Sequence, residues 1–177
     1  MSFRIGLILS VVFLTASCGF RPLYAPSGAG NAAENVFAFD VFRKIEIRLI
    51  ADREGQFLRN KLTQLMHPSG KAQIVEYDLG ITLTESKADL AVRQSSDATR
   101  ANLTITGAYV LYSRSEEQNI LGGSVQSTSG YNIFESEFQT LSAEKSARER
   151  ALNDVAQQIR LRLATEFARD DRYTGHQ

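Results

Sequence analysis

The sequence predicts an α+β fold, a two-layer sandwich in which one four-stranded, mostly antiparallel sheet is covered by two helices. Several stretches alternate apolar and polar residues with a period of two, as strands with one buried face do. Two further stretches carry an apolar stripe at helical spacing. The predicted order is strand, helix, three strands, helix. Because a sheet with one apolar face needs a cover, we expect both helices on that face.

The first strand and the first helix are predicted at the start of this domain. Residues 45–50 alternate Ile and Leu with Glu and Arg, which indicates a strand. Asp52 is then a predicted helix N-cap. The apolar stripe of the helix consists of Phe57, Leu58, Leu62, Leu65 and Met66. Residues 67–70 contain a Pro and a Gly that end the helix, with His67 as the expected C-cap residue.

Three strands are predicted next. Alternation extends over residues 75–84 and again over residues 101–114. Residues 87–93 between them are expected to include a turn or a rim of the sheet. The third strand, residues 120–134, has a weaker pattern because it is rich in Gly, Ser and Asn. Three consecutive strands of this kind predict antiparallel neighbours.

The last helix has the clearest pattern in the chain. Ser142 is its predicted N-cap, and Glu144 lies in the first turn, where the helix dipole favours an acidic residue. Its apolar stripe consists of Leu152, Val155, Ala156, Ile159, Leu163 and Phe167. We therefore place the domain at residues 41–170 and a polar tail at residues 171–177.

The N-terminus has the three-part layout of a secretory signal peptide. Arg4 supplies a positive head, an apolar run follows from Ile5 to Leu14, and small residues come next. The apolar run is about half of the ~20 residues that a membrane-spanning helix needs. Residues 1–17 are therefore predicted to be an export signal that is removed.

Cys18 is the single cysteine of the chain, and it follows Leu-Thr-Ala-Ser, which resembles a bacterial lipobox. We predict that Cys18 is lipidated and that residues 18–40, which contain Pro and Gly, are a tether. Two or three acyl chains give stable anchoring, since one chain alone is marginal. Gly19, in place of an Asp, favours the outer membrane. The alternative is an ordinary signal peptide with a chance cysteine nearby.

Charge and motif content exclude several classes of protein. The chain has 20 basic and 20 acidic residues, and loss of Arg4 with the signal leaves 19 against 20, a net charge of −1. A nucleic-acid binder is normally basic, so no nucleic-acid partner is expected. The sequence has no phosphate-binding loop, nucleophile elbow or metal-spaced Cys/His cluster. We expect no cofactor and no enzyme activity, and we interpret Glu76 and Asp78 as part of a solvated strand face.

Four basic residues near the central strands are candidate ligand-binding residues. They are Lys87, Arg93, Arg100 and Arg114. Arg93 and Arg100 bracket a predicted hairpin tip. Guanidinium groups pair well with phosphate, so these residues are candidates for holding an anionic ligand. The alternative is ordinary surface charge that keeps strand ends soluble.

The segment CGFRPLY, residues 18–24, directly after the lipobox, resembles the mature start of the LptE family of lipopolysaccharide-assembly lipoproteins, the alphaproteobacterial members above all. The resemblance implies a small α+β domain that plugs the LptD β-barrel of the outer membrane. It also implies a role in barrel assembly, contact with lipopolysaccharide, and its insertion into the outer leaflet. The lipid-anchored domain would then face the periplasm.

One feature of the strands fits such a plug. Small polar residues occupy one strand face and can hydrogen-bond a polar partner wall: Thr82, Thr84, Thr104, Thr106 and the run from Ser124 to Ser129. The alternative function is that of another periplasm-facing outer-membrane lipoprotein, an accessory of a transport or envelope system. An anchored hydrolase would need a clustered nucleophile and base, and the sequence shows no such pair.

Overall fold

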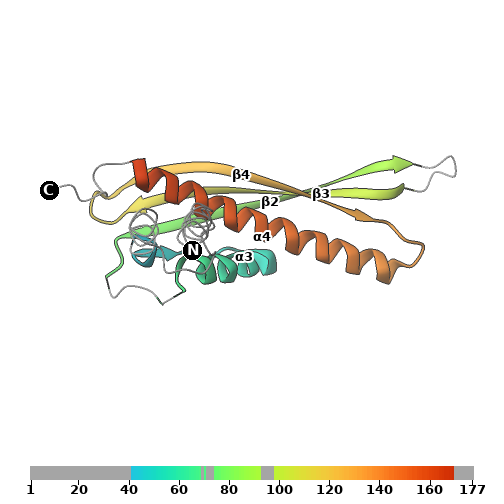
Figure 1. Ribbon diagram of the computed structural model, residues 1–177, viewed down its shortest axis with the longest axis horizontal. Helices are drawn as coiled ribbons and strands as arrows, with labels where there is room; N and C mark the ends of the chain where they lie inside the picture. The colour runs from blue at the N-terminus through green and yellow to red at the C-terminus, as the bar shows by residue number, and fades with distance from the viewer. Residues whose placement is uncertain (1–40, 69, 71–73, 93–97, 170–177) are drawn as a thin grey trace, which may run out of the picture. The chain divides into compact units, whose positions relative to one another are not determined.

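The computed structural model describes residues 41–68, 70, 74–92 and 98–169, all of which belong to one compact unit of the chain. In the described part of the chain two helices and four strands follow one another in the predicted order, and Figure 1 shows their arrangement. The elements are β1 (Ile45–Ile47), α3 (Asp52–Met66), β2 (Tyr77–Val92), β3 (Ala98–Ser113), β4 (Gln118–Asn132) and α4 (Glu137–Arg169). The predicted signal (1–17), tether (18–40) and tail (171–177) lie outside the described residues.

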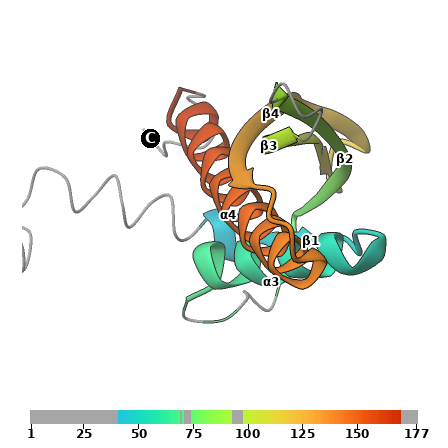
Figure 2. The ribbon, with the colours of Figure 1, turned by 90° about the vertical axis from the view of Figure 1, so that its right-hand side faces the viewer.

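The four strands form one sheet in the order β1-β2-β3-β4. β1 pairs with β2 in parallel, while β2–β3 and β3–β4 are antiparallel. The predicted mostly antiparallel sheet is therefore confirmed. β2 and β3 are paired over nearly their whole lengths, from Tyr77 opposite Ser113 to Val92 opposite Ala98. Figure 2 shows α3 and α4 on the same face of the sheet, which confirms the two-layer arrangement.

The core lies between this sheet face and the two helices. Both predicted helical stripes supply it: Leu58, Leu62 and Met66 of α3, and Leu152, Ile159 and Leu163 of α4, are all almost fully buried. The sheet contributes alternate residues, among them Leu79, Leu103, Ile105, Tyr109 and Leu111. The period of two and the helical spacing thus predicted the correct buried faces.

Three predicted boundaries differ most from the structure. β2 continues to Val92, so Lys87 lies in a strand and not in a turn, and it pairs with Leu103. Pairing with β3 extends it past the point where its apolar alternation stops. α4 begins at Glu137, so Ser142 is inside the helix. β1 ends at Ile47, and the next residue, Arg48, leaves the strand while its N–H still donates to the Leu79 carbonyl.

The connection from β1 to α3 is unusually tight. Asp52 has φ 65°, a left-handed conformation that non-glycine residues seldom adopt. Ala51 takes the N-cap position without a side-chain hydrogen bond, so the predicted capping role of Asp52 was wrong. A Cβ on Gly55 would lie 2.6 Å from Cγ2 of Ile50. Glycine at position 55 therefore lets Ile50 pack directly on the first turn of α3.

The end of α3 agrees with the prediction. His67 is the C-cap residue, and its backbone N–H donates to the Thr63 carbonyl at 2.9 Å. The ring is buried, with Nε2 3.0 Å from the Phe42 carbonyl oxygen. His67 therefore ties the end of the helix to the segment that precedes β1.

Candidate functional site

The sheet face opposite the helices carries no described helix (Figure 2), and we call it the open face. Strand register places alternate residues of β2, β3 and β4 on it. They include Thr82, Thr84, Ser86, Thr104, Thr106, Ala108, Ser124, Gln126 and Thr128. The predicted grouping of the four threonines is confirmed. The run from Ser124 to Ser129 alternates instead, and Ser127 lies buried on the helix side, where it donates to Asp154.

The open face is polar but uncharged along most of its length. Asp78 lies at one end of it and Arg100 at the other, and the described side chains between them carry no formal charge. Thr104 and Thr128 share a cross-strand hydrogen bond between their Oγ1 atoms at 2.9 Å. Small hydroxyl side chains lose little entropy when a partner orders them. No charge has to be desolvated when another polar surface covers the middle of this face.

Lys87 lies on the opposite, helix-facing side of β2. Its Nζ is 2.6 Å from Glu144 of α4 and 3.8 Å from Glu85. The hydrogen bond to Glu144 raises the pKa of Lys87 above its ordinary value, against the opposing effect of burial. Burial by itself would raise the pKa of Glu144, but hydrogen bonds from Lys87 and Arg148 outweigh burial and lower it. Lys87 is therefore engaged within the domain.

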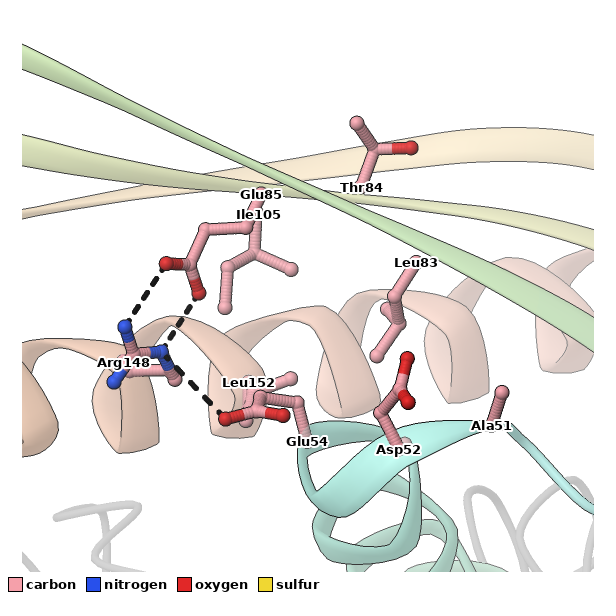
Figure 3. Close-up of a pocket in the computed structure, with 10 residues that line it drawn as sticks. Ala51, Asp52, Glu54, Leu83, Thr84, Glu85, Ile105, Arg148 and Leu152 are labelled. Carbon is pink, nitrogen blue, oxygen red and sulfur yellow. Dashed lines mark hydrogen bonds and ion pairs between the residues drawn. The ribbon is translucent and has the colours of Figure 1, made fainter.

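Arg148 is the centre of this ion-pair network (Figure 3). Its guanidinium binds Glu85 through two nitrogens, at 2.7 and 2.9 Å, and Glu144 at 2.6 Å. Glu54 of α3 lies 3.9 Å away. The hydrogen bond to Glu85 is the largest effect that raises the pKa of Arg148. A forked guanidinium suits such a site because it can satisfy two carboxylates at once.

Arg114 follows β3 at the other end of the sheet, where it binds Asp78. Its Nε and Nη2 lie 3.0 and 2.7 Å from the carboxylate oxygens, and Arg48 lies 3.4 Å away. Hydrogen bonding from Arg114 lowers the pKa of Asp78. Asp78 is only 8% exposed, so our interpretation of a solvated face was wrong for this residue. Two arginines cover it, whereas Glu76 pairs with Lys44 at the surface at 2.9 Å.

The three predicted basic residues that the structure describes, Lys87, Arg100 and Arg114, do not gather at one place. Arg100 is exposed at the far end of β3 on the open face, beside Gly130. It is fourteen positions from Arg114, about 45 Å at the usual rise per residue. Lys87 points to the helices, and Arg93 lies outside the described residues, as does Cys18. Their predicted roles in ligand binding and lipidation remain predictions.

A cleft of about 320 Å³ opens beside Arg148, between the start of α3 and β2. Figure 3 shows Asp52 reaching into it from the tight turn. Its lining combines an apolar part, made by Ala51, Leu83, Ile105 and Leu152, with the carboxylates of Asp52, Glu54 and Glu85. Among residues 41–169, as far as they are described, no group of three or more His, Cys, Asp or Glu could hold a metal ion. No described helix is long and apolar enough to cross a membrane.

Sequence reasoning missed the Arg148 network, although one signal for it was present. Apolar alternation on β2 stops at Leu83. The next positions on the same, helix-facing side of the strand are charged: Glu85, Lys87 and Asp89. Charges at helix-facing positions require partners on the covering helix. Glu144 and Arg148, four residues apart on one helical face, are such partners.

The family model described as "LptE: Lipopolysaccharide-assembly" matches residues 42–163, which is more than half of the chain. No curated protein has a significantly matching sequence. Among solved structures, a lipoprotein from Caulobacter crescentus CB15 is similar, with a TM-score of 0.62 and 19% identity over 76% of this chain and 98% of that chain.

Two other lipoproteins have the same fold. Rare lipoprotein B from Shewanella oneidensis gives a TM-score of 0.56 at 8% identity and covers 70% of this chain and 96% of that one. A minor lipoprotein from Acinetobacter baumannii gives 0.55 at 16% identity, covering 71% and 95%. At these identities the structural likeness shows the fold alone.

Proposed function

The chain belongs to the LptE lipopolysaccharide-assembly family, and on that premise we propose that it is an outer-membrane lipoprotein that partners and plugs the LptD β-barrel. It supports assembly of the barrel and the insertion of lipopolysaccharide into the outer leaflet. The anchor is the lipidated Cys18, and the domain faces the periplasm. Its effect comes through binding and not through catalysis.

The chemistry of the open face is the observation that supports contact with the barrel. The lumen of an outer-membrane barrel is polar, so its wall offers hydrogen-bonding groups. The open face matches such a wall with hydroxyl and amide side chains, for example Thr84, Thr104 and Gln126. It lacks charges that would have to be buried unpaired along its middle, and such charges would oppose a lasting contact.

A bulky charge in the middle of the open face tests this contact. Ala108 is exposed at the centre of β3, and Ala108→Arg should greatly reduce co-purification of the barrel from detergent-solubilised outer membranes. Gln157→Arg adds the same charge at an exposed position of α4 and should leave the barrel complex at its normal level. Equal recovery of the barrel with both variants would contradict an open-face contact.

Depletion of the protein tests the function as a whole. We expect misassembled barrel, lipopolysaccharide held in the periplasm or inner membrane, and a leaky outer membrane. Barrel level and surface lipopolysaccharide are measured together after depletion. Normal amounts of both would refute the proposed function.

The lipid anchor has a separate test. Cys18→Ala removes the thiol that would carry the diacylglyceryl group, so palmitate labelling of the protein should vanish and signal peptidase II should leave the precursor uncleaved. Labelling that persists in this variant would rule out Cys18 as the lipidated residue.

Binding of lipopolysaccharide is proposed for Arg100 together with Arg93. Arg100 is exposed on the open face, and the described part of the chain offers it no ion-pair partner, whereas Lys87 and Arg114 are already paired with carboxylates. Arg100→Gln should weaken binding of the soluble domain to lipopolysaccharide at low salt, because exposed charge is screened at high salt. Arg114→Gln is the matched control. If the four substitutions Lys87→Gln, Arg93→Gln, Arg100→Gln and Arg114→Gln together leave binding unchanged, the basic residues do not hold the glycolipid.

A further inference from the structure

The outer edge of β2 is paired along only a short part of its length. β1 pairs with Tyr77 to Leu79, and beyond that the described residues supply no strand on this side. The Leu79 carbonyl accepts from Arg48 on the outer side, so residues of the same parity direct their N–H and C=O groups outward. These are the backbone groups of Leu83, Glu85 and Lys87. A free strand edge of this kind is a template for another strand.

The opposite edge of the sheet is treated differently. On β4, side chains of α4 reach the outward carbonyls, with Gln158 donating to Gln126 at 3.2 Å and Arg150 donating to Gly130 at 3.2 Å. Arg150 also donates to the Ser129 hydroxyl. The helix thus protects the β4 edge with its own donors. In the described part of the chain, no side chain protects the backbone of residues 83–87 in this way.

The cleft lies directly beside this free part of β2. Leu83, Ile105 and Leu152 give it an apolar surface that a side chain of a neighbouring strand could bury. Its charge is unbalanced, because Asp52, Glu54 and Glu85 line it together with one cation, Arg148, which is already bound to Glu85 and Glu144. The cleft is therefore complementary to a strand that carries an apolar and a basic side chain.

We propose that the β2 edge at residues 83–87 is a docking site where an extended segment of a partner protein adds a strand to the sheet. Backbone hydrogen bonds hold the segment, an apolar side chain of the partner enters the cleft, and a Lys or Arg of the partner meets Asp52 and Glu54. The proposal rests on the proposed function only in placing the partner in the outer membrane.

Substitutions at Glu85 isolate the backbone contact. Glu85→Pro removes the outward N–H, while the ladder to β3 is kept because position 85 directs its N–H away from β3. Glu85→Ala removes the same carboxylate and the same bond to Arg148 but keeps the N–H. The two variants therefore differ in the backbone donor and are a matched pair.

The readout is a photo-crosslink from the full-length lipoprotein in cells. A photoreactive residue at exposed Ser86 should form an adduct with another protein, and one at exposed Gln157 of α4 should not. The Ser86 adduct should fall about 2- to 12-fold in Glu85→Pro relative to Glu85→Ala, the range expected for one hydrogen bond. Equal adduct yields in these two variants would overturn the proposal.

A charge variant keeps the proposal testable if Glu85→Pro does not fold. Asp52→Asn tolerates the left-handed backbone and should reduce the Ser86 adduct by up to about fivefold, as expected for an exposed ion pair. Adducts with lipopolysaccharide alone, with a second copy, or with the chain itself would overturn the proposal. A photoreactive residue at Ala108 tests the proposed function separately. If it forms an adduct with the barrel while Ser86 forms no protein adduct, the proposed function is intact. If neither position forms an adduct, the proposed function is contradicted as well.

Discussion

The two halves of the interface between the sheet and α4 are built from different chemistry. In the apolar half, the buried residues Tyr109 and Leu111 of β3 belong to the same core cluster as Ile159, Leu163 and Phe167 of α4. In the ionic half, side chains at equivalent sheet and helix positions are charged: Glu85, Lys87, Glu144 and Arg148. Tyr131 adds its hydroxyl to that network, 3.5 Å from Glu144.

The two halves contribute differently to the stability of the domain. Burying a large apolar side chain contributes about 1.5–3 kcal/mol, whereas the attraction within a partly buried ion-pair network is largely offset by the cost of taking its charges out of water. The ionic half therefore contributes less to the free energy of unfolding than the apolar half does. Its directional hydrogen bonds instead fix the orientation of β2 relative to α4. The apolar half supplies stability, and the ionic half fixes how the long hairpin lies on α4.

The largest expected effect is a cavity in the apolar half. Ile159 is fully buried, and Ile159→Ala should lower the free energy of unfolding by about 2–5 kcal/mol, the usual range for such truncations. Leu161→Ala is the control, because Leu161 lies two residues away on the same helix but is 65% exposed. Chemical denaturation measures both. A similar loss in the two variants would mean that the apolar half is not the stabilising region.

Removal of the central cation of the ionic half should cost less. Arg148→Ala leaves Glu85 and Glu144 without their main partner, and we expect a loss of about 1–3 kcal/mol in unfolding free energy. Arg169→Ala, which removes an exposed pair with Glu166, should cost below about 0.5 kcal/mol. A loss for Arg148→Ala as large as that for Ile159→Ala would erase the proposed difference between the halves.

Acid should loosen the ionic half before the apolar half. The pKa of Glu144 is lowered in the folded state from its ordinary 4.5, so its contribution is present above pH 4.5 and is lost as the pH falls through the folded value. Lys87 has the opposite sign, since its raised pKa means that stability is lost as pH rises above 10.5. Amide exchange of Ser86, whose N–H faces β3, should accelerate in acid relative to that of Gly80, which faces β3 in the same way. Glu144→Gln should remove much of that difference.

The smallest effect is expected at the surface of the apolar half. Lys44 and Glu76 are paired at 2.9 Å with side chains 42% and 39% exposed, so solvent screens them. Lys44→Ala should change the unfolding free energy by less than about 0.5 kcal/mol in thermal denaturation. A loss above 1 kcal/mol would show that surface charge stabilises both halves.

Periodicity predicted the elements that have one apolar face. The stripes of α3 and α4 and the alternation of β3 are local patterns, and burial followed them at Leu62, Ile105 and Ile159. Local signals were poorer at element ends. β2 extends past Leu83 because β3 pairs with it. α4 starts before Ser142. Neither boundary depends on apolar periodicity, so the pattern could not predict it.

The candidate surfaces divide in the same way. The grouping of Thr82, Thr84, Thr104 and Thr106 on one face follows from the period of two, so sequence was enough to predict it. Lys87, Arg100 and Arg114 do not lie together, because alternation sends Lys87 to the helix face and strand length separates Arg100 from Arg114. The presence of a basic residue in the sequence does not predict whether its side chain is exposed to solvent or paired with a carboxylate.

The sequence by itself determined the α+β class, the order of the elements, the buried faces and the family, because each of these depends on residues close together in the chain. Three features depend on tertiary structure alone: Arg148 binds Glu85 across 63 residues, the cleft forms beside Asp52, and no strand among the described residues pairs with the outer edge of β2 beyond Leu79. These features depend on how far β1 extends and on which helix lies above which strand. Packing of distant segments sets both, and no local pattern encodes them.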